Sequence, residues 1–525
     1  MYLKDEGKIW LATGENRVYL EPSMANRHGL IAGATGTGKT VTLKVLAESF
    51  SDLGVPTFVA DIKGDLTGMS VPGEPTKHIL RSIESMGIEN FDYKSYPARF
   101  FDVYAKSGHP VRTTISEMGP ELLSRLLGLS DVQSGVLRII FRIADDRGLL
   151  LIDLKDLRSM LRYVGDNAAE FKLKYGNVSP VSVGAIQREL LALEDNGGDI
   201  FFGEPELDLS DWFDWDEAGR GVMNILECSE LFLHPLLYST FLLWMLSELY
   251  ELLPEAGDLD KPKIAFFFDE AHLLFNDAPK ALIEKVEQVV RLIRSKGVSV
   301  WFITQNPADI PESVLAQLGN RVQHALRAYT PNEQKGLRAA ARSFRENPAF
   351  DTESALQELA VGEALISVLD EKGVPTVVER AGILPPQSSM NIADPGVVRV
   401  AIAQSPLFDK YSVIVDRESA YEVISAEADA AAEEAAKAAE EAAKAKEEAE
   451  RAKEEAAKAK EEERKRKEEE REKERQEREK EKKKKAAATK RKNSAVGKAV
   501  NSTATSMGRE IGRQLIRGLF GTIKK

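Results

Sequence analysis

The sequence predicts an α/β fold with a mostly parallel central sheet, and three stretches carry this prediction. Residues 33–40 form a glycine-rich loop between an apolar run and a helical pattern. Residues 55–60 and 264–268 are short apolar runs that each end in acidic side chains. Strands that are apolar throughout are typical of parallel sheets covered on both faces, and ligands bind where such strands end. We therefore expect one functional edge along the carboxyl ends of the strands.

Composition limits the class of protein. The chain has 525 residues and 43% hydrophobic content, enough for a large globular core. Its single cysteine, Cys228, excludes an internal disulfide and suits a reducing compartment, so we expect a cytoplasmic protein. The first residues are charged and polar, unlike a signal peptide. The most apolar run, 231–253, contains His234, Pro235 and two glutamates, which favours a buried helix over a membrane span.

Charge limits how the chain can contact nucleic acid. The formal net charge of −13 argues against a protein that coats nucleic acid, because neutralising phosphates needs clustered Lys and Arg. Nearly all charged residues in 482–525 are basic, so the part before residue 426 is more acidic than the total. Any contact with nucleic acid in that part must therefore be local, such as a pore loop.

Residues 33–40, Gly-Ala-Thr-Gly-Thr-Gly-Lys-Thr, match the G-x-x-x-x-G-K-[ST] pattern of a phosphate-binding loop. Two short strands, 8–12 and 17–21, are expected before it and a helix over 41–50 after it. Glycines let backbone N–H groups close around a polyphosphate. Lys39 would reach the β- and γ-phosphates, and the Thr40 hydroxyl would bind Mg²⁺. The expected ATP-binding residues of this loop are Gly33, Ala34, Thr35, Gly36, Thr37, Gly38, Lys39, Thr40 and Val41.

The strand at 55–60 ends in a polar stretch, 61–65. If the strand is parallel and buried, Asp61, Lys63 and Asp65 lie near the nucleotide, whereas an ordinary surface turn would have a similar composition. We expect Asp61 and Lys63 to bind the nucleotide.

A largely helical insertion is expected over 68–262. Apolar residues have helical spacing at 117–145 and 154–163, while 221–227 has the composition of a buried strand. The tryptophan-rich stretch 209–215 is expected to be a loop packed on the core. No residue pattern in the insertion indicates catalysis.

The strand at 264–268 is followed directly by two carboxylates, Asp269 and Glu270. Asp269 would hold Mg²⁺ or its water, and Glu270 would polarise the water that attacks the γ-phosphate. His272 is interpreted as a packing residue, which is the commoner role of such a histidine.

Further polar residues follow the next predicted elements. A strand over 298–303 ends at Gln305, whose amide could hydrogen-bond the γ-phosphate. Arg294, at the end of a helix over 281–296, and Arg321, after a helix over 312–317, could stabilise transition-state charge from a neighbouring subunit. Either arginine could equally be an ordinary salt-bridging residue. A pair of strands over 362–369 and 374–380 is expected to complete the sheet.

Together these motifs resemble the HerA/FtsK group of RecA-like motor ATPases, closest to bacterial HerA-like proteins of poorly defined function. The resemblance covers 8–388 and rests on the phosphate loop, Asp61-Ile62-Lys63-Gly64-Asp65, Phe268-Asp269-Glu270-Ala271-His272, Ile303-Thr304-Gln305-Asn306-Pro307 and Asn320-Arg321. It implies a RecA-like P-loop NTPase core, a hexameric ring with ATP sites between subunits, and DNA translocation through the pore.

The resemblance also implies roles for single residues. Phosphate binding falls to Lys39 and Thr40, and γ-phosphate sensing to Gln305. Arg294 or Arg321 would act in trans. One departure is that the residues ahead of Gly33 are too few for the β-barrel that precedes the motor in archaeal HerA proteins. This weighs against a nuclease partner of the archaeal kind.

Beyond residue 426 the composition changes to Ala, Glu, Lys and Arg. Oppositely charged residues recur at i,i+4 spacing, which favours a long solvated helix. A stripe of alanines at 3-4 spacing leaves open a thin coiled coil, and a disordered polyampholyte is also compatible. At 506–525 apolar and basic residues fall on different helical faces, which suits an anionic membrane surface, DNA phosphates or a protein partner.

We therefore expect an ATPase domain over 1–390, a connecting segment over 391–425, a low-complexity segment, helical or disordered, over 426–493 and a basic amphipathic helix over 494–525. Two functional classes remain. One is an ATP-hydrolysing motor that translocates or unwinds DNA. The other is an ATP-gated oligomeric scaffold that recruits partners through its tail without translocation.

Overall fold

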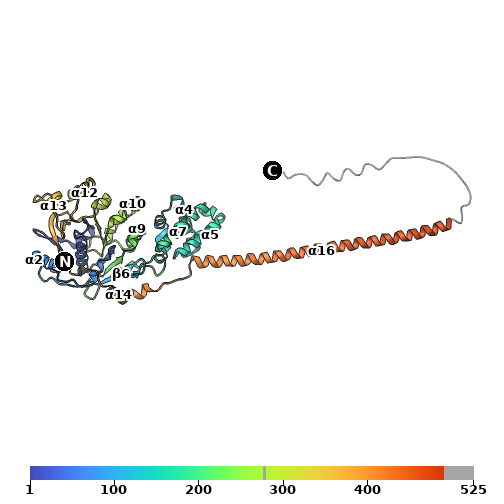
Figure 1. The fold of residues 1–525 in the computed structure, drawn as a ribbon, viewed down its shortest axis with the longest axis horizontal. Coiled ribbons are helices and arrows are strands. Elements are labelled where there is room, and N and C mark those ends of the chain that lie inside the picture. Colours follow the sequence, from blue (N-terminus) through green and yellow to red (C-terminus); the bar gives the residue numbers. More distant parts are fainter. Residues whose placement is uncertain (276–279, 490–525) are drawn as a thin grey trace. The chain divides into compact units, whose positions relative to one another are not determined.

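A computed structural model of the chain describes residues 1–275 and 280–489. Its central element is a mixed β-sheet, which contains thirteen strands within that part of the chain (Figure 1). In sheet order the strands are β1 (Tyr2–Leu3), β2 (Lys8–Thr13), β13 (Glu379–Ile383), β12 (Glu363–Ser367), β11 (Asn320–His324), β4 (Gly29–Ala32), β10 (Val298–Thr304), β9 (Ile264–Phe268), β5 (Thr57–Asp61), β8 (Met223–Glu227), β6 (Ala98–Asp102) and β7 (His109–Pro110), with β3 (Arg17–Leu20) paired to β2.

The sheet is parallel from β11 to β7 and antiparallel from β12 to β1. Every residue of β5, β9 and β10 is buried, which explains why these strands are apolar throughout. Successive side chains point to opposite faces, so Phe266 and Phe268 pack in one hydrophobic core and Phe267 in another. The predicted α/β fold with a mostly parallel sheet is confirmed.

Helices cover both faces of the sheet. On one face, α1 (Lys39–Asp52) packs across the sheet, and α14 (Pro395–Gln404) adds partly buried apolar residues to the same core. On the other face, α9 (Pro235–Leu252) and α10 (Lys280–Ile293) lie against each other. A third, smaller core joins α12 (Pro331–Arg342) and α13 (Thr352–Glu358).

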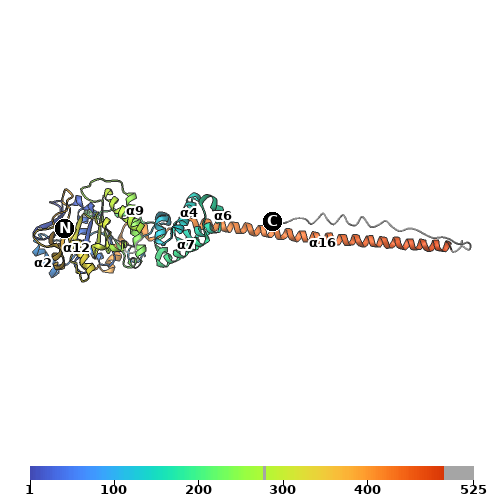
Figure 2. The same cartoon turned by 90° about the horizontal axis from the view of Figure 1, so that it is seen from above.

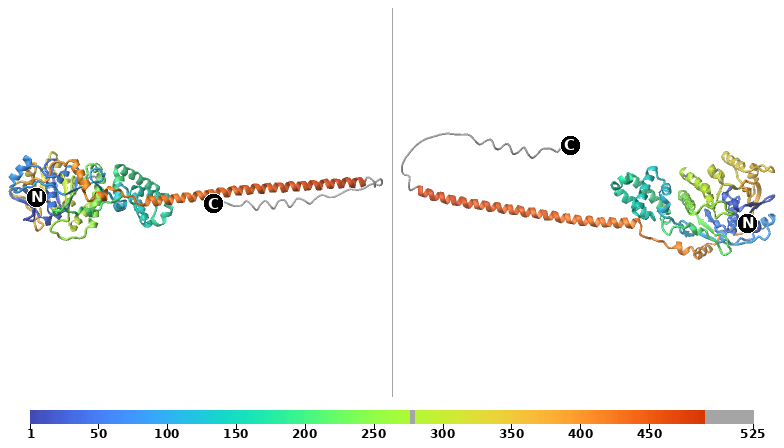
Figure 3. Two further views of the ribbon diagram at one scale, coloured as in Figure 1. Left: turned by 90° about the horizontal axis from the view of Figure 1, so that it is seen from below. Right: turned by 180° about the vertical axis from the view of Figure 1, so that it is seen from behind.

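The insertion between β5 and β9 contains most of the remaining helices, and those between residues 131 and 193 gather as a teal group in both views of Figure 3. Its helices are α2 (Lys77–Ser85), α3 (Ile115–Leu126), α4 (Asp131–Arg147), α5 (Leu154–Asp166), α6 (Ala168–Tyr175), α7 (Pro180–Leu193), α8 (Asp199–Phe201) and α9. The predicted helix over 117–145 is two helices. The break has a local cause, because Gly128 adopts φ 60° and Ser130 begins α4 with a capping box to Gln133.

Two further features of this region concern the sequence predictions. The strand predicted at 221–227 is confirmed as β8. Trp212, in the stretch 209–215 that was expected to pack on the core, is buried and stacks on Phe58. The insertion also contributes β6, which the sequence analysis missed. The apolar run 231–253 forms the buried helix α9, and none of the helices in the described residues is long and apolar enough to cross a membrane.

Downstream, α11 (Glu312–Leu315) and the β12–β13 pair follow the predicted order. The turn at 370–373 is present, with Asp370 N donating to Val374 O at 2.9 Å. The ladder, however, pairs Glu363–Ile366 with Glu379–Gly382, so the second strand begins five residues later than predicted.

The chain divides into two compact units, Met1–Asp429 and Ala430–Lys525. Residues 391–425, expected as a connecting segment, contain α14, α15 (Phe408–Ser412) and the first turns of α16 (Ala420–Thr489). The start of α16 is fixed within the first unit by Asp156, which is fully buried at the start of α5. Its Oδ1 accepts from Ser419 Oγ at 2.5 Å and Tyr421 N at 2.9 Å, and its Oδ2 accepts from Ile152 N at 2.8 Å.

The predicted long charged helix is confirmed as α16, drawn as one uninterrupted helix in Figure 2. From residue 430 to 485 its residues are exposed. Three of the predicted i,i+4 ion pairs form, namely Lys437–Glu433 at 2.6 Å, Lys444–Glu440 at 2.7 Å and Arg451–Glu447 at 2.7 Å. The predicted amphipathic helix at 494–525 lies outside the described residues.

Candidate ATP-binding site

The glycine-rich loop leaves β4 and runs directly into α1. Gly33 N donates to Thr304 O at 3.2 Å and Ala34 N donates to Ala325 O at 2.9 Å, which holds the loop over the ends of the neighbouring strands. Gly36 and Gly38 have φ of 75° and 116°, a region that favours glycine. A Cβ at Gly33 would lie 2.5 Å from His324 Cβ, so the loop lies too close to its support for any side chain there.

This loop has the shape and the donors that a polyphosphate requires. α1 begins at Lys39 without a side-chain cap, so the first-turn N–H groups are not used by a capping side chain. A helix N-terminus of this kind binds anions through N–H groups and the helix dipole. Thr40 and Val41 are in the first turn, and binding of Mg²⁺ by the Thr40 hydroxyl remains a prediction.

Lys39 lies within the loop and is only 6% exposed. Its Nζ donates to Gly33 O at 2.6 Å and to Ala34 O at 3.1 Å. Burial lowers its pKa, and the nearby Glu270 and Asp269 carboxylates partly oppose that effect. The structure therefore brings together the predicted phosphate-binding lysine and the predicted acidic pair.

The acidic pair is buried at the end of β9. Asp269 and Glu270 are 7% and 5% exposed, and Asp269 Oδ1 accepts from Glu270 N at 2.9 Å. Burial raises the pKa of Asp269, although Lys63 opposes the shift. Burial acts in the same direction on Glu270, but Lys63 and Gln305 outweigh it, so the pKa of Glu270 lies below its usual value. Glu270 therefore stays a carboxylate that can accept a proton.

Gln305 connects the loop with the acidic pair. Its Oε1 accepts from Thr35 Oγ1 at 3.3 Å, and its Nε2 lies 3.3 Å from each carboxylate oxygen of Glu270. The geometry follows from the sheet, because β10 lies between β4 and β9 and ends with Thr304. One amide thus contacts both the phosphate loop and the predicted base.

The two residues predicted from the β5 strand end differ in their surroundings. Lys63 Nζ lies 3.1 Å from Glu270 Oε1 and 3.5 Å from Asp269 Oδ2. Asp61 is buried and accepts from Leu66 N at 2.9 Å and Asp65 N at 3.2 Å, and burial raises its pKa to about 7. Asp61 thus shapes the loop that carries Lys63, and direct nucleotide contact by either residue remains a prediction.

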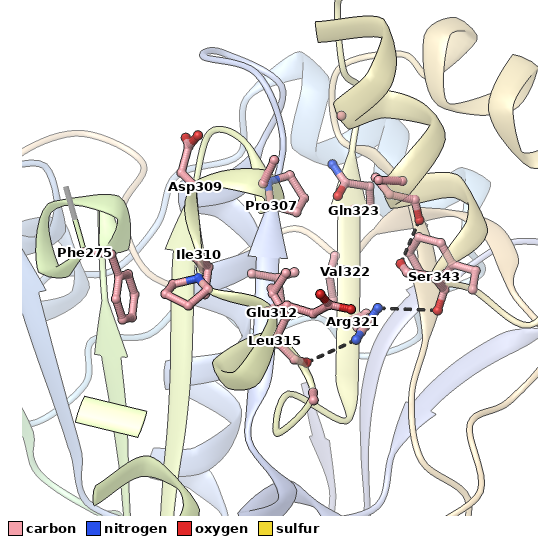
Figure 4. Close-up of a pocket in the computed structure, with 18 of the residues that line it drawn as sticks. Phe275, Pro307, Asp309, Ile310, Glu312, Leu315, Arg321, Val322, Gln323 and Ser343 are labelled. Carbon is pink, nitrogen blue, oxygen red and sulfur yellow. Dashed lines mark hydrogen bonds between the residues drawn. The ribbon is translucent and has the colours of Figure 1, made fainter. Parts of the chain in front are cut away.

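The two arginine candidates lie away from the phosphate loop of their own chain. Arg294 precedes β10 and so lies at the amino ends of the parallel strands, whereas Gly33 lies at their carboxyl ends. Burial lowers the pKa of Arg294. Arg321 is on β11 and lines a cavity of about 850 Å³, where its guanidinium donates to the carbonyls of Leu315 and Ser343 (Figure 4). It also donates to the carbonyl of Leu318. Their action on a neighbouring subunit remains a prediction.

Sequence reasoning missed His324, which packs against the phosphate loop and the first turn of α1. Its Nε2 lies 2.8 Å from Thr42 Oγ1 and its Nδ1 lies 2.9 Å from Glu363 O, and burial lowers its pKa to about 4. No local pattern indicated this role, because β11 has the largely polar sequence Asn-Arg-Val-Gln-His. His272, interpreted as a packing residue, has its Nδ1 3.4 Å from Glu270 Oε2.

A phosphate loop of this geometry, with a neighbouring buried strand that ends in two carboxylates, defines a P-loop nucleoside triphosphatase. The chain matches the family model of the helicase HerA-like C-terminal domain over residues 6–525. It therefore belongs to the HerA-like family, within the HerA/FtsK superfamily of P-loop motor ATPases.

Comparison with solved structures finds bacterial proteins of low sequence identity. The conjugative coupling protein TrwB in an unbound form is 14% identical, with 74% of this chain and 91% of that chain covered and a TM-score of 0.49. TrwB bound to a non-hydrolysable ATP analogue is 14% identical over 70% and 88% of the two chains, with a TM-score of 0.48. VirB4 of Thermoanaerobacter pseudethanolicus is 14% identical over 71% and 96%, with a TM-score of 0.44. No curated protein matches the chain in sequence.

Proposed function

We propose that this protein hydrolyses ATP as a ring-forming motor that translocates or unwinds DNA. The observation that carries the proposal is the Gln305 amide, which contacts both Thr35 of the phosphate loop and Glu270 at the end of β9. A side chain in this position can respond to the γ-phosphate and to the base at once. The site thus couples nucleotide binding to the residue that would activate water.

Each side chain of the site has a defined task in this proposal. Lys39 neutralises phosphate charge, and Glu270 accepts a proton from the attacking water. Thr40 and Asp269 would hold Mg²⁺, which would neutralise the charge that develops on the phosphate groups. Gln305 orients Glu270 and reports the state of the phosphate loop.

Oligomerisation and the DNA track belong to the same proposal. We propose a homohexamer in which Arg294 or Arg321 stabilises the transition state at a neighbouring subunit's site. DNA would pass through the pore, with local contacts because the net charge is −13. Buried, unpaired Cys228 suits a reducing cytoplasm.

The exposed helix α16 favours a second candidate function. A 70-residue helix whose surface from 430 to 485 is exposed offers a long contact surface for partners. The protein would then be an ATP-gated scaffold whose tail captures a protein or an anionic membrane surface. This candidate predicts ATP turnover that does not respond to DNA.

One experiment separates the two candidates. ATP turnover is measured with and without double-stranded and forked DNA, on full-length protein whose oligomeric mass is known. A motor shows DNA-stimulated turnover that Lys39→Ala abolishes. Turnover that is indifferent to DNA, together with loss of partner capture on deleting 426–525, supports the scaffold. Absence of ATP binding in the presence of magnesium would refute both.

A further inference from the structure

Lys63 is the nearest cation to the buried acidic pair. Its Nζ contacts Glu270 Oε1 at 3.1 Å and Asp269 Oδ2 at 3.5 Å, so one ammonium group lies against both carboxylates. Two adjacent carboxylates in a buried position repel each other, and a single positive charge relieves that repulsion. Lys63 therefore stabilises the arrangement of the pair described above.

One of the two carboxylates that Lys63 contacts would also be used by a magnesium ion. Asp269 is the carboxylate assigned to Mg²⁺, and a divalent cation and an ammonium group repel each other at this separation. We infer that Lys63 is a positioning residue that competes with Mg²⁺ for the Asp269–Glu270 pair and leaves the pair when Mg²⁺·ATP binds. This inference rests on the proposed ATP-hydrolysing function.

The surroundings of Lys63 allow its side chain to leave while the backbone stays. The Lys63 side chain is 43% exposed, in contrast to the buried Lys39. The loop behind it is fixed, because the Asp61 carboxylate accepts hydrogen bonds from Leu66 N and Asp65 N. Gly64 follows Lys63 at φ 69°, and a Cβ there would meet no atom within 4 Å. Lys63 can thus move into solvent by side-chain rotation alone.

Departure of Lys63 changes what holds Glu270. Gln305 Nε2, at 3.3 Å, and His272 Nδ1, at 3.4 Å, remain as its neighbours. Both contacts keep the carboxylate oriented.

The test compares Lys63→Met with Lys63→Arg and with the control Lys94→Met. Lys94 pairs with Asp52 at 2.8 Å, away from the site, so its loss removes an ion pair of the same kind. The first readout is the Mg²⁺ concentration that half-saturates binding of a fluorescent ATP analogue to the full-length protein. The second is the affinity for the analogue at saturating Mg²⁺, and thermal melting checks that each variant is folded.

Competition predicts that Lys63→Met lowers the half-saturating Mg²⁺ concentration by roughly two- to five-fold, the range expected for a partly exposed ion pair. At saturating Mg²⁺ the affinity for the analogue should equal that of wild type, since Lys63 no longer contacts the carboxylate pair. Lys63→Arg and Lys94→Met should keep the wild-type Mg²⁺ dependence.

An unchanged or raised Mg²⁺ requirement in Lys63→Met would overturn the inference. So would weaker binding of the analogue by Lys63→Met at saturating Mg²⁺, because Lys63 would then contact the nucleotide itself. If wild-type protein binds the analogue but does not hydrolyse ATP, the proposed function fails while the Mg²⁺ titration still decides the role of Lys63.

Discussion

The two units of the chain reach ordered structure by opposite means. In the first unit, the strands β5, β9 and β10 bury every side chain, and helices on both faces exclude water. In the second, α16 is exposed from 430 to 485 and has i,i+4 ion pairs in place of a core. Burial of apolar surface stabilises the first unit, whereas local helix propensity stabilises α16 in the second. We therefore expect a single substitution to change activity or stability strongly in the first unit and very little in the second.

Glu270→Gln should give the largest effect, because it removes the proton acceptor at the centre of the first unit. We expect ATP turnover to fall by about 10²- to 10⁴-fold while nucleotide binding persists. Turnover and analogue binding are measured side by side. Glu121→Gln, an exposed glutamate paired with Arg138, is the control. Wild-type turnover in Glu270→Gln would show that another group activates the water.

Phe267→Ala tests the packed core directly. Phe267 is fully buried between Phe50 and Trp301, at ring-centroid distances of 6.1 and 6.2 Å. Loss of the ring should lower the free energy of unfolding by about 3–5 kcal/mol. Urea denaturation measures the change, and Leu173→Ala, at a residue 99% exposed, should stay within about 0.5 kcal/mol of wild type. Equal effects at both positions would contradict the comparison.

Acid should weaken the first unit through its buried histidines. Burial lowers the pKa of His28 and of His324 to about 4, against about 6.5 in an unfolded chain. Between these values the unfolded chain binds protons that the folded chain excludes. Stability is therefore fully present above pH 6.5 and lost as the pH falls towards 4, on the order of 2 kcal/mol per histidine. Unfolding free energies at pH 7 and pH 5 measure this loss.

The control for the acid prediction is His28→Asn. His28 has φ 59°, a conformation that asparagine tolerates. This variant should lose less stability between pH 7 and pH 5 than wild type does. A pH dependence as steep as that of wild type would exclude His28 as a source. All six histidines lie in the first unit, so α16 beyond residue 430 contributes nothing to this titration.

Asp156→Ala acts where the first unit holds the beginning of α16. The change removes the acceptor for Ser419 Oγ, Tyr421 N and Ile152 N, and caps of this kind are worth about 1–2 kcal/mol. We expect faster amide hydrogen exchange over 420–424 and a lower urea midpoint. Asp166→Ala, at an exposed position on the same helix α5, should change neither. Unchanged exchange in Asp156→Ala would mean that other contacts hold this turn.

Lys444→Glu should have the smallest effect. It breaks one exposed ion pair to Glu440 and adds a like-charge neighbour, at a cost of about 0.3–0.5 kcal/mol in helix stability. Circular dichroism of the full-length variant should match wild type within a few per cent of its helical signal. A large loss of helicity would indicate that α16 depends on a partner surface.

Sequence reasoning was strongest where function depends on local pattern. The phosphate loop, the Asp269–Glu270 pair and Gln305 follow strands whose apolar composition marks them, so their meeting at one sheet edge was predictable. The contact of His324 with Thr42 joins residues 282 positions apart, and no local pattern encodes it. The same limit hid β6, which pairs with distant β8, and the direction of Lys63 towards the carboxylates. Side-chain direction depends on tertiary packing, which pattern alone does not contain.

The left-handed backbone at Glu270, with φ 47°, has a practical consequence for preparing stable complexes. Glutamate is uncommon in that conformation, whereas asparagine is several-fold enriched there. An asparagine at this position would lack the proton acceptor and at the same time relieve torsional strain. Glu270→Asn would therefore be a better variant than Glu270→Gln for isolating the protein with unhydrolysed ATP bound.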